Sequence, residues 1–306
     1  MPYETTERDG HTLDILTNAN KTLRLTVSRN GAEPVGLAKK NAAADWVGFL
    51  WRDGDVTKNP SGWNNHSTVM GYYIHRILNE KTQYRGHVIR GGTHSFIRHK
   101  VFDAPEVGES GLVYKLSAKS IGPEEYPFQV DFTLSYTLDD AGLRIGFAFD
   151  NRESTESHVS FGLHPGFGVT SLADAVVLMP KGKYRRHIAP GNFLSGEIVE
   201  LDIAGGPMPF AKSDLPGSFL LELATVPERM FVVEDPVTQR RTTLDFSEAP
   251  YVTLWSDGND FVCVEPCWGL PDHHEQRAFE DKLGIQTIPA GGRLEAGFYV
   301  LPEVVA

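Results

Sequence analysis

The residues best suited to acid–base chemistry follow two short apolar runs. Glu265 follows Phe261-Val262-Cys263-Val264 and precedes Pro266. Because a proline cannot donate to a strand ladder, this run predicts a strand that ends at the glutamate. His164 comes at the end of a second apolar run and also precedes a proline. Histidine titrates near neutral pH, and burial raises the pKa of a glutamate toward that range. Together the two groups could supply an acid and a base.

The alternation around His164 predicts which way its side chain points. Side chains of a strand alternate between its two faces, so Val159, Phe161 and Leu163 share one face, and a polar, lightly filled face carries His158, Ser160, Gly162 and His164. Such a face is typical of the wall of a wet cavity, although a water-facing sheet would show the same pattern. A single glutamate is also more often exposed than functional. The pair therefore needs partners from elsewhere in the chain.

Two upstream stretches offer such partners. Arg76 lies in an apolar segment, residues 69–77, and its guanidinium presents a fixed fork of donors to ligand oxygens. His94 follows Gly91-Gly92, where the backbone can approach a ligand closely. An arginine that caps a surface loop and an ordinary loop histidine remain the alternatives.

The elements that must position these residues are strands. Residues 128–138 and 143–149 alternate strictly on either side of Asp139-Asp140-Ala141-Gly142, which predicts a hairpin. Amphipathic helices are almost missing from the pattern; residues 273–282 could form one short turn or helix. We therefore predict an all-β fold, a large antiparallel sandwich or barrel, as one domain over residues 1–306. Further strands are expected at 23–27, 112–118, 159–163, 219–223, 229–233, 242–246, 251–255 and 298–301.

Composition narrows the class of ligand. The 306 residues carry a net charge of −11, with acidic and basic residues interspersed. This argues against nucleic acid or an anionic membrane as a partner and favours a small, weakly charged substrate. The two cysteines, Cys263 and Cys267, are expected to be reduced packing residues, without a disulfide or a metal. No signal peptide and no membrane span is recognisable, so we expect a cytoplasmic protein.

Taken together, these stretches resemble the aldose 1-epimerase (galactose mutarotase) family, and most closely its shorter, LacX-like branch. That branch typically has Gly-Arg-Leu, a glycine after a polar hairpin, and His-Gly-Phe-Ala-Arg. Its later motifs are His-Pro with an aromatic, then Trp-Ser/Thr, and Phe-Val-Cys-Ile-Glu-Pro-Trp-Tyr-Gly. The chain matches them in order, from residue 23 to 301, with His75-Arg76-Ile77, Gly86, His94-Ser95-Phe96-Ile97-Arg98, His164-Pro165-Gly166-Phe167, Trp255-Ser256 and residues 261–269.

The resemblance implies a β-sandwich with a sugar cleft on one concave sheet, and it implies roles for five residues. His164 would donate a proton to the ring oxygen of an aldose, and Glu265 would take the proton of the anomeric hydroxyl. Arg76 and His94 would anchor sugar oxygens, and Trp268 would cover an apolar sugar face. Neither a metal nor a cofactor is required.

Three departures and two alternatives remain. His75 and Ser95 replace motif glycines. Longer members of the family hold a sugar hydroxyl with an aspartate, for which Asp214 is the only candidate in this chain.

A hexose 6-phosphate mutarotase would need a basic cluster, for which the chain offers Arg85, Arg90, Arg98 and Lys100. A non-catalytic carbohydrate-binding protein on the same scaffold would not need the acid–base pair. Either a monomer or a homodimer is compatible with the sequence.

Overall fold

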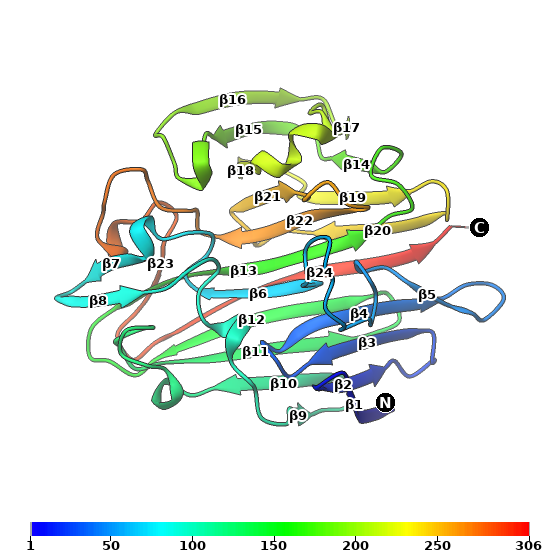
Figure 1. Cartoon of the computed structure of the whole chain (residues 1–306), viewed down its shortest axis with the longest axis horizontal. Coiled ribbons are helices and arrows are strands. Elements are labelled where there is room, and N and C mark those ends of the chain that lie inside the picture. The colour runs from blue at the N-terminus through cyan, green and yellow to red at the C-terminus, as the bar shows by residue number, and fades with distance from the viewer. Residues whose placement is uncertain (1, 306) are drawn as a thin grey trace.

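A computed structural model describes residues 2–305 of the chain (Figure 1). Within these residues the chain forms 24 strands and six short 3₁₀-helices, so the all-β expectation is confirmed. The strands pair antiparallel throughout and build two large sheets, one smaller sheet and one separate hairpin.

The larger sheet has nine strands and forms one layer of a β-sandwich. The predicted hairpin forms two of its inner strands as β11 and β12, in register from Val130 opposite Asn151 to Leu138 opposite Leu143. In spatial order the sheet consists of β17 (Gly206–Pro207), β14 (Val176–Met179), β19 (Met230–Asp235), β20 (Arg240–Asp245), β24 (Arg293–Val304), β12 (Leu143–Asn151), β11 (Val130–Leu138), β10 (Gly111–Leu116) and β9 (Glu106–Val107).

The second large sheet has eight strands and carries the candidate site. Figure 1 shows β21, β22, β13 and β6 running side by side across the middle of the molecule. Its strands are β16 (Ile198–Ile203), β15 (Gly182–His187), β18 (Phe219–Thr225), β21 (Tyr251–Trp255), β22 (Phe261–Trp268), β13 (Ser157–Gly168) and β23 (Gln286–Ile288), with β6 (Ser67–Tyr72) paired to β13.

The hydrophobic core fills the space between these two sheets. Phe161 of β13 packs against Phe147 and Phe149 of β12, with ring centroids 5.3 and 4.9 Å apart. Trp268 of β22 stacks on Phe161 at 5.0 Å, with the ring planes 9° apart. Burial of such large aromatic side chains dominates the energetics of a core. Because this core takes one face of β13 and β22, the opposite face is left for the site.

The remaining elements are a five-stranded sheet, a hairpin and the 3₁₀-helices. The five-stranded sheet and the hairpin are not hydrogen-bonded into the two large sheets, although the five-stranded sheet shares their hydrophobic core. They comprise β1 (Tyr3–Arg8), β2 (His11–Thr17), β3 (Leu23–Ser28), β4 (Glu33–Lys40) and β5 (Trp46–Gly48), and β7 (Lys81–Tyr84) with β8 (His87–Arg90). The 3₁₀-helices are η1 (Leu78–Glu80), η2 (Ile97–His99), η3 (Ala118–Ser120), η4 (Pro190–Asn192), η5 (Lys212–Gly217) and η6 (Phe279–Asp281). Of the predicted turn or helix over residues 273–282, only η6 is helical.

One prediction about strand ends is wrong. Proline was expected to end the strands after His164 and Glu265, but β13 continues through Pro165 to Gly168 and β22 continues through Pro266 to Trp268. The ladder between β13 and β22 is instead interrupted between the pairs Gly162–Cys267 and Gly166–Cys263. The physical reason is that a proline lacks a donor but still fits an extended backbone when packing holds the strand in place.

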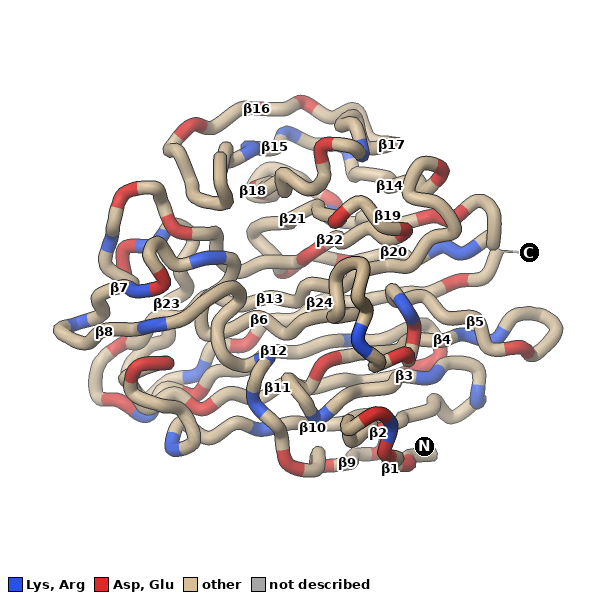
Figure 2. The backbone as a smooth tube through the Cα atoms, viewed as in Figure 1, with Lys and Arg blue, Asp and Glu red and all other residues tan. Residues whose placement is uncertain are grey.

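The surface agrees with the interspersed charge of the sequence. Figure 2 shows acidic and basic residues alternating along most of the chain rather than gathering in one block of either sign. Among the described residues, none of the helices has the length and apolar character needed to cross a bilayer.

Candidate active site

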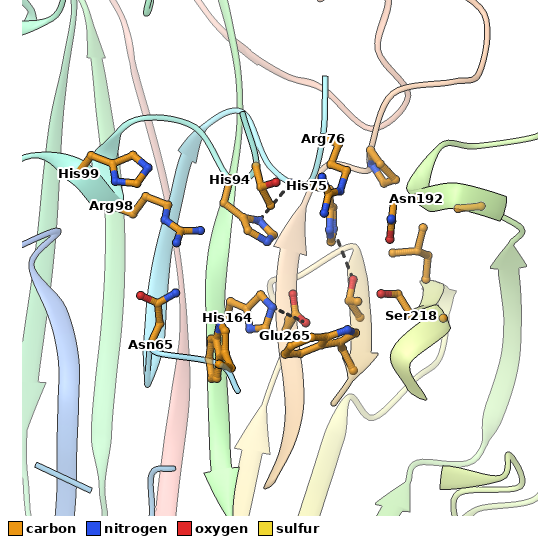
Figure 3. Close-up of a pocket in the computed structure, with 18 residues that line it drawn as sticks. Asn65, His75, Arg76, His94, Arg98, His99, His164, Asn192, Ser218 and Glu265 are labelled. Atoms are coloured by element: carbon orange, nitrogen blue, oxygen red, sulfur yellow. Dashed lines mark hydrogen bonds and ion pairs between the residues drawn. The ribbon is translucent and has the colours of Figure 1, made fainter. Parts of the chain in front are cut away.

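A cavity of about 450 Å³ opens on the eight-stranded sheet, on the face turned away from the core (Figure 3). Side chains of β13, β22, β21 and β18 form its floor, and the segments before η1 and around η2 form one wall. His164, Glu265, Arg76 and His94 all line it, so the structure brings together four of the five site residues that the sequence singled out.

Strand register explains why the floor residues meet. The pairs that flank the proline interruption place His164 of β13 opposite Glu265 of β22. Thr253 of β21 is the register partner of Glu265 on the other side, and Leu220 of β18 is the partner of Thr253. Opposed residues of antiparallel strands share a face. These four side chains therefore form one row across the sheet.

His164 and Glu265 form a close, buried pair at the centre of this row. Nε2 of His164 lies 3.4 Å from Oε1 of Glu265, and the two side chains are 8% and 1% exposed. The second carboxyl oxygen, Oε2 of Glu265, is buried without a hydrogen-bond partner in residues 2–305. An unsatisfied buried polar atom is costly and marks a place where a ligand could bind.

Burial shifts both pKa values away from the charged forms. It raises the pKa of Glu265 well above its ordinary value and lowers the pKa of His164 to about 3, with a smaller contribution from His75. Desolvation penalises a carboxylate and an imidazolium alike. Both shifts favour the neutral forms, so in the empty site the two groups hold one proton between them, on the Glu265 carboxyl. Two groups in such close contact titrate as a unit.

His94 is fixed in one tautomer by its neighbour. The backbone N–H of His75 donates to Nδ1 of His94 at 3.2 Å, and the N–H of His94 donates to the carbonyl of His75 at 2.8 Å. Burial and the nearby His164 hold the pKa of His94 well below its ordinary value. The neutral ring therefore carries its proton on Nε2, which makes His94 a donor toward the cavity.

The two motif glycines that this chain replaces both sit in left-handed backbone conformations. His75 has φ of 54° and Ser95 has φ of 66°. Glycine adopts positive φ readily, whereas another residue there is strained by about 1–2 kcal/mol. Both positions thus have the backbone conformation that glycine favours, although this chain places a side chain there. At position 75 it adds an imidazole whose Nε2 lies 3.5 Å from Oγ1 of Thr253 on the floor.

Fixed positive charge surrounds the pair. Arg76 and Arg98 line the cavity, and neither guanidinium has an ion pair within residues 2–305. The other basic candidates are engaged elsewhere, since Arg85 pairs with Glu156, Arg90 with Glu124 and Lys100 with Glu125. Glu265 is the only carboxylate among the cavity residues. The cavity is therefore electropositive although the whole chain is acidic.

Trp268 requires a correction. It was expected beside Glu265 as a cover for the sugar, but it faces the core, and its indole N–H donates to the carbonyl of Glu248 at 3.1 Å. An odd separation of three residues along a strand puts it on the face opposite Glu265. Trp63 and Trp255 take the expected place, with rings 4.8 and 5.2 Å from that of His164.

Gly166 makes room for one of these rings. A side chain at Gly166 would approach Cζ3 of Trp63 to 2.6 Å, so the indole can lie over β13 only because this position has no Cβ. At this position the cavity face of β13 is thus covered by an aromatic ring from a distant loop. Trp63 was not among the site residues that the sequence singled out, because nothing in its local pattern indicates that it reaches His164.

The candidate for a hydroxyl-holding aspartate lies outside the cavity. Asp214 is exposed in η5 and is not among the cavity residues, although Gly217 and Ser218 close to it in sequence line the cavity.

His164, Cys263 and Glu265 offer ligand atoms within 4.8 Å of one another, which makes them the candidate place for a cation. Burial raises the pKa of Cys263 well above its ordinary value. The thiolate that a metal needs is therefore disfavoured, and a metal-free site stays our prediction.

Comparisons with known proteins identify the family of the chain and relatives of its fold. Protein LacX of Lactococcus lactis is 23% identical over 270 residues, which cover 80% of this chain and 86% of that protein. A galactose mutarotase related enzyme from Lactobacillus acidophilus superposes with a TM-score of 0.83 at 20% identity, covering 99% of this chain and 97% of the other. A galactose mutarotase-like protein from Lactobacillus casei gives 0.81 at 24% identity, covering 94% and 100%. The aldose 1-epimerase family model matches residues 14–274, and the chain therefore belongs to the aldose 1-epimerase family.

Proposed function

We propose that this protein is a mutarotase, which interconverts the α and β anomers of an aldose by opening and reclosing the sugar ring. The observation that carries the proposal is the buried contact of 3.4 Å between Nε2 of His164 and Oε1 of Glu265 on the cavity floor. Ring opening needs one group that gives a proton and one that takes a proton, both within reach of the same hemiacetal. A pair that holds a single proton meets this requirement.

The reaction begins when the proton of Glu265 moves to Nε2 of His164 as the sugar binds. Sugar hydroxyls then solvate the carboxylate, whose Oε2 has no partner in the empty site. His164 donates its proton to the ring oxygen, the C1–O bond breaks, and Glu265 takes the anomeric proton as the aldehyde forms. Rotation about C1–C2 and the reverse steps on the other carbonyl face give the second anomer. The pair ends with the same single proton, so no co-reactant is consumed.

Binding roles follow from the donors around the pair. Nε2–H of His94 and the free guanidinium of Arg76 donate to sugar oxygens, while Trp63 offers an apolar ring beside His164. Such groups hold the anomeric centre against the acid and the base, and orientation of this kind supplies much of a catalyst's advantage.

A phosphorylated aldose is the second candidate substrate. The observation that favours it is that Arg76 and Arg98 both reach the cavity without a carboxylate partner. Guanidinium groups bind phosphate oxygens in a bidentate manner. A non-catalytic sugar-binding role is less well supported, because binding does not require a buried imidazole beside a buried carboxyl.

The test is anomer exchange measured by NMR or polarimetry over a panel of free and phosphorylated hexoses and pentoses. We expect exchange of at least one aldose well above its spontaneous rate. Tight binding of sugars without exchange would favour the binding protein and would contradict the mutarotase.

A further inference from the structure

A buried ion pair lies beneath the rim of the cavity, outside the residues that line it. Nζ of Lys282 contacts Oδ1 of Asp272, and the two side chains are 2% and 8% exposed. Lys282 follows η6, and Asp272 follows the cavity residue Pro271. Neither residue belongs to the acid–base pair or to any motif discussed above.

Asp272 brackets the segment that carries Arg76. Its Oδ2 accepts a hydrogen bond from the backbone N–H of Leu78 at 2.8 Å. Its own N–H donates to the carbonyl of Arg76 at 3.1 Å. Two bonds from one residue thus fix the backbone directly after Arg76.

The other side of Arg76 is fixed by the paired histidines. His75 exchanges two hydrogen bonds with His94, and it holds a left-handed backbone conformation that needs such support. The guanidinium of Arg76 itself has no ion pair or hydrogen bond within residues 2–305. Arg76 is exposed, so what holds this residue toward the cavity is its backbone, which the His75–His94 pair fixes on one side and Asp272 on the other.

Lys282 holds Asp272 in its working orientation. The carboxylate directs one oxygen to Lys282 and the other to Leu78, so removal of the ammonium would leave it free to turn and unpaired in a buried place. Buried ion pairs contribute little net stability compared with apolar residues of similar size. The pair is therefore better explained by what it positions than by the stability it adds.

We propose that Asp272 and Lys282 are positioning residues that hold Arg76 in place for sugar binding. This inference rests on the proposed function, because it assigns a role in substrate binding to residues that never touch the substrate. It predicts that loss of the pair weakens sugar binding through Arg76 and leaves the acid–base pair intact.

The first test is the double variant Asp272→Leu/Lys282→Met, which removes the side-chain acceptor of the Leu78 N–H and leaves neither charge buried alone. We expect KM for anomer exchange to rise by about 10-fold or more, since small misplacements of a binding group are costly, while kcat stays within about threefold. In an Arg76→Ala background the same pair of changes should raise KM by less than about twofold, because the pair affects sugar binding only through Arg76, which this background already lacks.

The matched control is the ion pair of Asp235 and Arg240 in the nine-stranded sheet, at 2.7 Å with side chains 3% and 17% exposed. Asp235→Leu/Arg240→Met, which makes the same kind of change at this control pair, should leave KM unchanged in the folded protein. A folded Asp272/Lys282 variant with wild-type KM would overturn the proposal. So would an equal rise in KM with and without Arg76, which would indicate a general structural effect.

A second measurement needs no variant and no activity. Hydrogen exchange of the Leu78 amide in the wild-type protein should be strongly protected, although η1 lies at the surface. Exchange at the rate of an open loop would mean that Asp272 does not hold this segment, and the proposal would be wrong. A wild-type protein without anomer exchange would contradict the proposed function, whereas the Leu78 result judges the positioning by itself.

Discussion

His164 and Glu265 face each other across β13 and β22 at the point where prolines interrupt the ladder between these strands. Pro165 and Pro266 each follow one member of the pair and remove a backbone donor from the centre of the sheet. Strands that continue on either side still hold the two side chains at 3.4 Å. Backbone hydrogen bonds between the two strands are thus lost at the site, while paired segments on both sides hold the strands in place. Functional sites are where proteins commonly keep buried polar groups without a full set of hydrogen bonds.

The first prediction concerns Arg76 and His94. Replacement of either residue by Ala removes a donor to a sugar oxygen, and a hydrogen bond contributes about 1.5–3 kcal/mol when one partner is charged and about 0.5–1.5 kcal/mol when both are neutral. In steady-state exchange kinetics we expect KM to rise by roughly 10- to 100-fold for the charged Arg76 and by roughly 2- to 10-fold for the neutral His94, with a smaller effect on kcat. Wild-type KM in both variants would exclude them from the sugar site.

Arg98 separates the two candidate substrates. If the substrate carries a phosphate, Arg98→Gln should raise KM for the phosphorylated aldose by about 10-fold or more and change KM for the free aldose little. If free aldoses are the substrates, phosphorylated sugars should exchange no faster than they do spontaneously, with or without Arg98. Parallel kinetics on one matched pair of sugars distinguish these outcomes.

The pKa shifts predict a bell-shaped dependence of kcat/KM on pH. The active pair holds one proton. As pH falls toward 3, the lowered pKa of His164, a second proton binds and the base is lost. As pH rises through the raised pKa of Glu265, the single proton leaves and the acid is lost. The two limbs of the kcat/KM profile report the pKa values of the acid and the base in the free enzyme. A profile without an alkaline limb would contradict the one-proton pair.

Activity should survive removal of metal ions. The thiol of Cys263 stays protonated because burial raises its pKa, so the cluster with His164 and Glu265 is a poor cation site. Exhaustive dialysis against EDTA should leave kcat unchanged. Loss of exchange that one divalent cation restores would show that the reaction depends on a metal.

Alternation along strands predicted much of the fold and of the site. It placed Phe161 in the core, His164 on the opposite face, and the hairpin of β11 and β12 almost to the residue. The same period of two contradicts the sequence-based placement of Trp268, which lies an odd number of residues from Glu265. That error came from treating neighbours in sequence as neighbours in space.

Other features could not be predicted from local pattern. Trp63 reaches His164 from a loop a hundred residues earlier in the chain, and Asp272 reaches Leu78 from nearly two hundred residues away. Contacts of this kind depend on how whole sheets pack. The edge strand β1 was missed because its mostly exposed residues lack an apolar period.

The most direct test of the central claim compares Glu265→Gln with Glu222→Gln. Glu222 lies in the same sheet and also contacts a histidine, with Oε2 at 3.1 Å from Nε2 of His187, but it does not line the cavity. The amide keeps the shape of the carboxyl while it removes the acid–base group. Exchange between α and β anomers is measured by NMR on a sugar that the wild-type protein turns over, with binding followed in parallel.

We predict that Glu265→Gln lowers kcat by about 10²- to 10⁴-fold and still binds the sugar, whereas Glu222→Gln exchanges anomers at the wild-type rate. His164→Asn should lose a similar factor, and the double variant much less than the product of the two losses, because both groups act in one concerted step. Wild-type exchange by Glu265→Gln would contradict the assignment of the His164–Glu265 pair as the catalytic acid and base.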